Sequence, residues 1–102
     1  MTEAFDVLLE GDSMWPTFVH GDVLTFSHHE SGDFNKGDVL LVRHPFNGSL
    51  LMVKRLKRIL DDGRLFVEGD QVDPTASEDS HNFGPIHVSS VVGRWTGLVK
   101  RA

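Results

Sequence analysis

The stretch LLMVKRLKRI at residues 50–59 predicts a β-strand that carries one basic residue into apolar surroundings. Because successive side chains of a strand point to opposite faces, Arg55 and Lys57 share one face and indicate contact with solvent there. On the other face, Lys54 stands between two apolar side chains. Two interpretations of Lys54 remain open. Its long stem can lie along the surface with the ammonium in water, or burial can lower its pKa and make it a general base.

Apolar runs of the same kind recur along the chain, separated by turn residues about every eight to twelve positions, as is typical of an all-β domain. They lie at 5–9, 22–26, 38–44, 64–69 and 91–99. No window combines a sustained helical period with both helix caps. We therefore predict a single, mainly β domain over residues 1–102, built of small, bent antiparallel sheets. Asn47-Gly48 and Asp62-Gly63 are predicted to form hairpin turns by supplying positive φ values.

The composition narrows the classes of function. Fifteen acids outweigh ten Lys and Arg residues, and the formal net charge of −5 argues against a dedicated nucleic-acid binder, since phosphate backbones favour excess positive charge. The chain has no cysteine, which excludes disulfides, thiolate catalysis and cysteine-based zinc sites. No apolar run approaches the roughly 18 residues of a membrane-spanning helix, and the acidic start is unlike a signal peptide. We expect a soluble, cytoplasmic chain without a membrane anchor.

A serine in the polar corner EGDSMWPTF, residues 10–18, is the first candidate for chemistry. Ser13 can be a turn residue, a helix cap or a nucleophile, and the corner lacks the GxSxG pattern of many hydrolases. The six histidines show no HExxH or other metal-binding spacing, so neither a metal nor a cofactor is predicted. A neutral lysine can take the proton of a serine hydroxyl, which makes Lys54 a candidate partner of Ser13. The polar stretch 69–82 is a candidate functional loop.

A series of motifs in fixed order resembles the catalytic domain of type I signal peptidases and their relatives. The motifs are GDSMWPTFVHGDVL, KGDVLLVRHP, MVKRLKRI, FVEGD followed by SEDSHNFGPI, and VVGRW. The resemblance runs from residue 10 to about residue 95 and implies the signal peptidase/LexA-like fold. It also implies a serine endopeptidase in which Ser13 is the nucleophile and Lys54 the general base. Ser77 matches a hydroxyl that hydrogen-bonds the lysine amine, and Asp79 matches a carboxylate that braces the site.

Four further residues take supporting roles from the same resemblance. Met14 and Pro16 are expected to shape the wall behind the nucleophile and to bind substrate. Gly11 stands where some membrane-bound relatives have a serine that helps form the oxyanion hole, so the hole would rely on backbone N–H groups, chiefly that of Ser13. His81 stands where the bracing loop usually has arginine, and a contact between His81 and Asp79 would be sensitive to pH near neutrality.

Within this group the chain is most similar to small proteases that mature nickel-containing superoxide dismutase. The resemblance implies that the partner is the dismutase precursor, whose N-terminal extension is removed to expose the nickel-binding N-terminus. Three alternatives remain: the soluble catalytic part of a type I signal peptidase, a self-cleaving regulator, and a non-catalytic binding module. Only 12 residues precede Ser13, which leaves little room for a self-cleavage segment. Retention of both Ser13 and Lys54 argues against a module without activity.

Overall fold

The fold, seen in a computed structural model, is described for residues 3–28, 34–73 and 78–102. The strands are β1 (Ala4–Leu8), β2 (Val23–His28), β3 (Val39–His44), β4 (Asn47–Ile59), β5 (Leu65–Glu68) and β6 (Val91–Lys100). They form one sheet in the order β1-β2-β6-β3-β4-β5, and each neighbouring pair is antiparallel. The mainly β fold is therefore confirmed.

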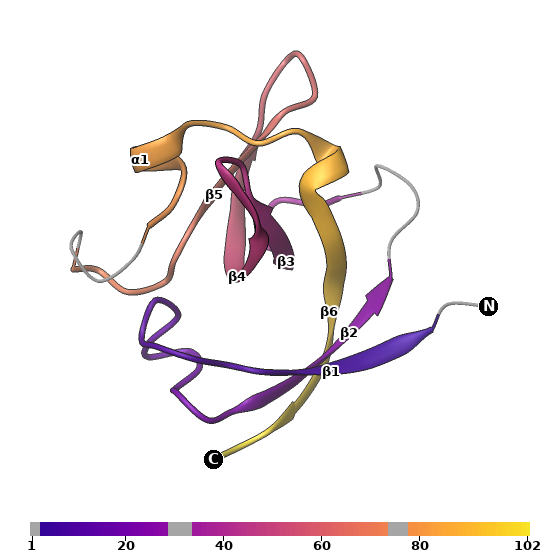
Figure 1. The fold of residues 1–102 in the computed structure, drawn as a ribbon, viewed down its shortest axis with the longest axis vertical. Coiled ribbons are helices and arrows are strands. Elements are labelled where there is room, and N and C mark those ends of the chain that lie inside the picture. The colour runs from indigo at the N-terminus through magenta and orange to yellow at the C-terminus, as the bar shows by residue number, and fades with distance from the viewer. Residues whose placement is uncertain (1–2, 29–33, 74–77) are drawn as a thin grey trace.

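The strand β6 joins two halves of a strongly bent sheet. Residues 40–42 of β3 pair with residues 91–94 of β6, and β2 pairs with β6 from Gly93 to Lys100, so both neighbours pair with Gly93 and Arg94. In Figure 1, β1 and β2 consequently run across the direction of β3 and β4. The bend brings the end of β1 close to β4, and both strands border one cavity.

The strand β3 separates two apolar cores, because its alternating side chains are buried on both faces. Val39 and Leu41 enter one core, and Leu40 and Val42 enter the other. This double burial explains why β3 is continuously apolar over these four residues. Complete burial of one such side chain contributes about 1.5–3 kcal/mol to the free energy of unfolding. The packing of β3 therefore stabilises the position of its neighbour β4, the strand that carries Lys54.

The turn of the β3–β4 hairpin differs from the predicted one. It is made by Pro45 and Phe46, and His44 pairs with Asn47. Gly48 lies inside β4 without a positive φ, so the prediction of an Asn47-Gly48 turn is wrong. Proline has its φ fixed for a turn and has no N–H for a ladder, which favours a turn at its own position.

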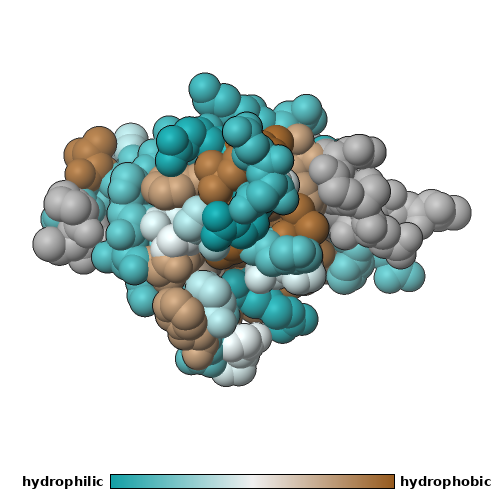
Figure 2. Space-filling model, turned by 90° about the horizontal axis from the view of Figure 1, so that it is seen from above, coloured by the Kyte–Doolittle hydropathy of each residue, from teal (hydrophilic) through white to brown (hydrophobic). Residues whose placement is uncertain are grey.

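The predicted β4–β5 hairpin is present, and Gly63 has the predicted positive φ, 87°. The positive φ predicted for Asp62 is wrong, because none of the described residues other than glycine has one. Two short helices, α1 (Ser80–Phe83) and the 3₁₀ helix η1 (Val88–Ser90), precede β6. Each is about one turn long, too short to produce the helical period sought in the sequence. None of the helices in the described ranges is both long and apolar enough to cross a bilayer. Figure 2 shows hydrophobic side chains in separate patches between hydrophilic ones.

Candidate active site

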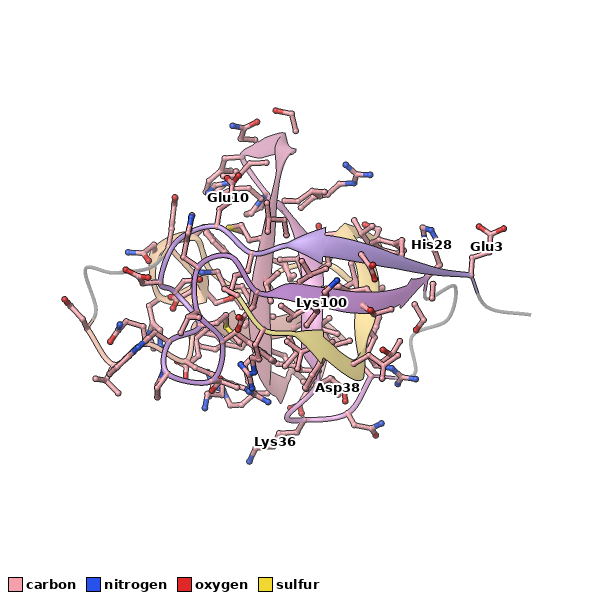
Figure 3. All side chains as sticks on the ribbon, turned by 90° about the horizontal axis from the view of Figure 1, so that it is seen from below. Glu3, Glu10, His28, Lys36, Asp38 and Lys100 are labelled. Carbon is pink, nitrogen blue, oxygen red and sulfur yellow. The ribbon has the colours of Figure 1, made fainter. Side chains whose placement is uncertain are left out.

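Ser13 and Lys54 line the same cavity, which has a volume of about 330 Å³. The end of β1, the middle of β3 and the first half of β4 supply the rest of a mostly apolar lining, including the exposed Leu8, Leu50 and Leu51. Glu10 also lines it, and Figure 3 shows Glu3 and Glu10 at opposite ends of β1. The cavity therefore lies where β1 ends and the chain turns toward Ser13.

Lys54 is buried, with only 3% of its surface exposed. In the β3–β4 ladder it lies opposite Leu40, whose side chain packs in the apolar core that also contains Val42. Burial lowers the pKa of Lys54, because the charged form loses its hydration, while the negative charges of Asp79 and Glu78 oppose this by raising it. The interpretation of Lys54 as a desolvated amine therefore fits the structure, and the one with its ammonium in open water does not.

Ser13 lies in the turn segment between β1 and β2 and is partly exposed. Its carbonyl oxygen accepts a hydrogen bond of 2.9 Å from the N–H of Gln71, which ties the segment to the loop after β5. Its hydroxyl and the Lys54 amine share the cavity without hydrogen-bonding to each other. Catalytic hydrogen bonds are often long without substrate and tighten when it binds.

Two open strand edges border the cavity. β1 is the terminal strand of the sheet, and β5 pairs with β4 only from Arg55 onward. The part of β4 that precedes Arg55 therefore has β3 as its neighbour on one side and none of the described strands on the other. Open edges of this kind accept an extended peptide through backbone hydrogen bonds.

Asp79 is buried at the N-cap of α1. Its Oδ1 accepts a hydrogen bond of 2.9 Å from the N–H of His81, and its Oδ2 accepts one of 3.4 Å from the N–H of Gly69. These bonds fix the carboxylate whose charge acts on Lys54. The expected partner of the lysine amine, Ser77, lies outside the described residues.

The side chain of His81 contacts a different acid from the expected one. Its Nε2 lies 2.6 Å from Oε2 of Glu68, and its backbone N–H donates to Oδ1 of Asp79. His81 therefore contacts Asp79 through its backbone, and the pH sensitivity expected of this contact stays a prediction. Burial raises the pKa of Glu68, but hydrogen bonds from His81 and Lys57 outweigh this and lower it.

Gly11 has a φ of 82°, a conformation that residues with a side chain rarely adopt. Its N–H donates a hydrogen bond of 2.9 Å to Nδ1 of His20. The Gly11 N–H is thus occupied, while the Ser13 N–H makes no hydrogen bond to the described part of the chain. Sequence reasoning did not identify His20, because nothing in its spacing indicates a contact with Gly11.

Neither Met14 nor Pro16 lines the cavity of Ser13 and Lys54. Met14 is fully buried in the core beneath the segment. Pro16 borders a second cavity of about 680 Å³, whose lining includes Thr17, Asp70 and His81. Their expected role in substrate binding stays a prediction.

An ion pair that the sequence did not indicate joins the two candidate catalytic segments. Asp70 accepts hydrogen bonds from Arg55 at 2.7 and 3.0 Å and from the hydroxyl of Thr17 at 2.7 Å. Arg55, expected in solvent, is therefore half-buried against a carboxylate. Asp70 thereby connects the segment of Ser13 with the residue next to Lys54.

In the described ranges, no group of three or more His, Asp or Glu side chains is arranged to hold a metal ion. An exposed, apolar cavity with a buried lysine suits a reaction on a peptide bound at a strand edge.

This chain is similar to a plant protease and matches a peptidase family. The Arabidopsis thaliana protein "Mitochondrial ATP-independent inner membrane protease subunit 1a" is 30% identical over 110 residues. That alignment covers 84% of this chain but 64% of the relative's own length. Residues 2–88 match the family described as Peptidase S24-like, which supports a serine peptidase. This chain therefore belongs to the Peptidase S24-like family.

Proposed function

We propose that this chain is a serine endopeptidase in which Ser13 is the nucleophile and Lys54 the general base. The observation that carries the proposal is the shared cavity of Ser13 and Lys54, in which burial lowers the pKa of the lysine. A lowered pKa raises the fraction of neutral amine that can accept a proton near neutral pH. Membership of the Peptidase S24-like family supports the same reaction.

In the proposed reaction, an extended segment of a protein substrate pairs with an open strand edge beside the cavity. Lys54 takes the hydroxyl proton as Oγ of Ser13 attacks the scissile carbonyl, and the Ser13 N–H stabilises the oxyanion. The proton passes to the leaving amine, the peptide bond breaks and an ester to Ser13 remains. Lys54 then removes a proton from water, which hydrolyses the ester and restores the serine.

The proposed substrate is a precursor protein that loses its N-terminal extension, and the resemblance to dismutase-maturing proteases makes nickel-containing superoxide dismutase the first candidate. No cofactor takes part, and the nickel belongs to the substrate. We further propose that the reaction takes place in the cytoplasm. A second candidate is a peptidase of the signal-peptidase type that acts at a membrane, and the name of the Arabidopsis relative favours it.

The test incubates the purified chain with the dismutase precursor and, separately, with a precursor that bears a secretory signal peptide, and follows intact mass. We expect loss of the dismutase extension, absent in Ser13→Ala and in Lys54→Ala. Lys36→Ala, at an exposed lysine before β3 (Figure 3), serves as the control and should cleave normally. Cleavage of the signal-peptide precursor alone would transfer the assignment to the second candidate. Cleavage that survives in both active-site variants would contradict the Ser13–Lys54 pair.

A further inference from the structure

We propose that His44 is a positioning residue for the Ser13–Lys54 pair: its buried imidazole holds Glu78, and through Glu78 the start of the segment that carries Asp79, beside Lys54. This inference rests on the proposed function. His44 is the last residue of β3, and only 7% of its surface is exposed. A buried imidazole on a hairpin needs partners for both ring nitrogens.

Both nitrogens of His44 have such partners. Nδ1 accepts a hydrogen bond of 3.1 Å from the N–H of Phe46, and Nε2 lies 2.9 Å from Oε1 of Glu78. Because Nδ1 is an acceptor, the proton of the neutral ring lies on Nε2, which therefore donates to Glu78. The β3–β4 turn thus fixes the tautomer that holds the carboxylate.

Aromatic contacts fix the orientation of the same ring. Its centroid lies 5.1 Å from that of Phe83 in α1, edge to face, and 5.9 Å from that of Phe46. The ring is therefore held by the hairpin and by α1. Glu78 itself is more than half exposed, so the histidine is the more enclosed member of the pair.

Glu78 links this anchor to the candidate base. It precedes Asp79 directly, and the charges of both acids act on Lys54 in opposition to the effect of burial. Among the described residues that line the cavity of Ser13 and Lys54, the acid is Glu10. Releasing Glu78 would remove one attractive charge from Lys54, so the pKa of Lys54 should fall further.

The test uses substitutions matched in shape. His44→Phe keeps an aromatic ring against Phe83 but loses the donor, whereas the amide of His44→Gln can still donate to Glu78. His87→Phe is the control, since His87 is exposed and contacts its own turn at Ser89. The first measurement titrates Lys54 by NMR on lysine labelled with 13C, with its signal assigned from Lys54→Met. It needs no substrate.

We expect His44→Phe to lower the pKa of Lys54, as Glu78→Gln does, and His44→Gln to restore it. The alkaline plateau of kcat/KM should fall by about 10-fold, less than the roughly 100-fold cost of a one-ångström misplacement, because the capping bonds still hold Asp79. In a Glu78→Gln background, His44→Phe should add little, since the two residues act through one contact.

An unchanged titration of Lys54 in His44→Phe overturns the inference, whatever the activity does. A full additional effect of His44→Phe on top of Glu78→Gln overturns it as well, because His44 would then act by another route. If the unmodified chain cleaves no precursor, the proposed function fails. The titration of Lys54 still decides on His44.

Discussion

Lys54 lies directly opposite Leu40 across the β3–β4 ladder, and both side chains are buried. This relationship explains how a small domain keeps a lysine from being fully hydrated. Because β3 is apolar on both faces, the inward side chains of the adjacent strand β4 pack in a core. Lys54 and Ser13 both line the cavity between β1 and β4.

The proposed peptidase should lose activity in acid as Lys54 becomes protonated. Because burial lowers the pKa of Lys54 from its ordinary value, kcat/KM should rise with pH through that lowered pKa and then level off. Asp79→Asn removes a charge that raises this pKa, so the rising limb should move to lower pH. The plateau should also be lower, because one acceptor oxygen that now bonds the N–H of Gly69 is replaced by an amide NH2. The measurement is a pH profile of kcat/KM for both proteins.

Asp62→Asn is the control for this profile, because Asp62 is exposed and pairs locally with Arg64. Its profile should coincide with that of the unmodified chain. A rising limb that stays in place in Asp79→Asn would show that Asp79 does not act on the titrating group.

Replacing the buried lysine should stabilise the fold while it abolishes cleavage. Lys54→Met keeps the length of the side chain and removes the cost of desolvating an ammonium, and we expect a gain of about 1 kcal/mol or more in the free energy of unfolding at neutral pH. Urea denaturation followed by circular dichroism measures it. A stability lower than that of the unmodified chain would indicate that the ammonium has favourable partners that outweigh its burial.

The pH dependence of the free energy of unfolding is a second measurement on Lys54→Met. The pKa of Lys54 is lower in the folded than in the unfolded state, so between these two values the unfolded state binds more protons. Over that window the contribution of Lys54 makes stability rise with pH, and it should be missing in Lys54→Met. Equal slopes for the two proteins would contradict the lowered pKa.

The contrast between local and distant contacts explains what the sequence could predict. The apolar runs predicted six strands because side-chain alternation is local. The same alternation left two interpretations of Lys54 open, and its burial is seen only in the structure. The Arg55–Asp70 pair and the His44–Glu78 pair join residues 15 and 34 positions apart, and neither leaves a trace in local periodicity. Their identification requires the register of β3, β4 and β5. The displaced hairpin turn shows the same limit, since Pro45 competed with a good Asn-Gly signal.

A serine at position 11 should not improve the oxyanion hole of this chain. Gly11 has a φ of 82°, so a side chain there is strained although the surrounding space is open. We expect Gly11→Ser to lower the free energy of unfolding by about 1–2 kcal/mol and to lower kcat, because the strain is relieved by moving Ser13. Gly11→Ala should be equally destabilising, and Gly48→Ala, at a glycine without positive φ, is the control. A rise in kcat for Gly11→Ser alone would show that the hydroxyl supplies a useful donor.

The C-terminal segment holds the base of the Ser13 loop through a buried carboxylate. Asp22 accepts hydrogen bonds from the N–H groups of Val19 and Ala102 at 3.0 and 2.9 Å, and from Arg101 at 3.0 Å. Arg101 also donates to the carbonyl oxygen of Thr17 at 2.9 Å. The backbone hydrogen bonds from Val19 and Ala102 are the main cause of the lowered pKa of Asp22, and Arg101 adds to it. These hydrogen bonds therefore hold the loop that carries Ser13 at the end that leads into β2.

Loss of the Asp22 carboxylate should reduce the stability of the fold in a pH-dependent way. The folded pKa of Asp22 is lower than the unfolded one, so its contribution is complete above the unfolded pKa and is lost as pH falls through the folded value. Asp22→Asn should therefore lower the melting temperature at neutral pH and narrow the difference from the unmodified chain in acid. Asp6→Asn is the control, because Asp6 lies exposed in β1 and bonds only the hydroxyl of Thr25. A constant difference in melting temperature across this range would mean that the carboxylate charge is not what fastens the loop.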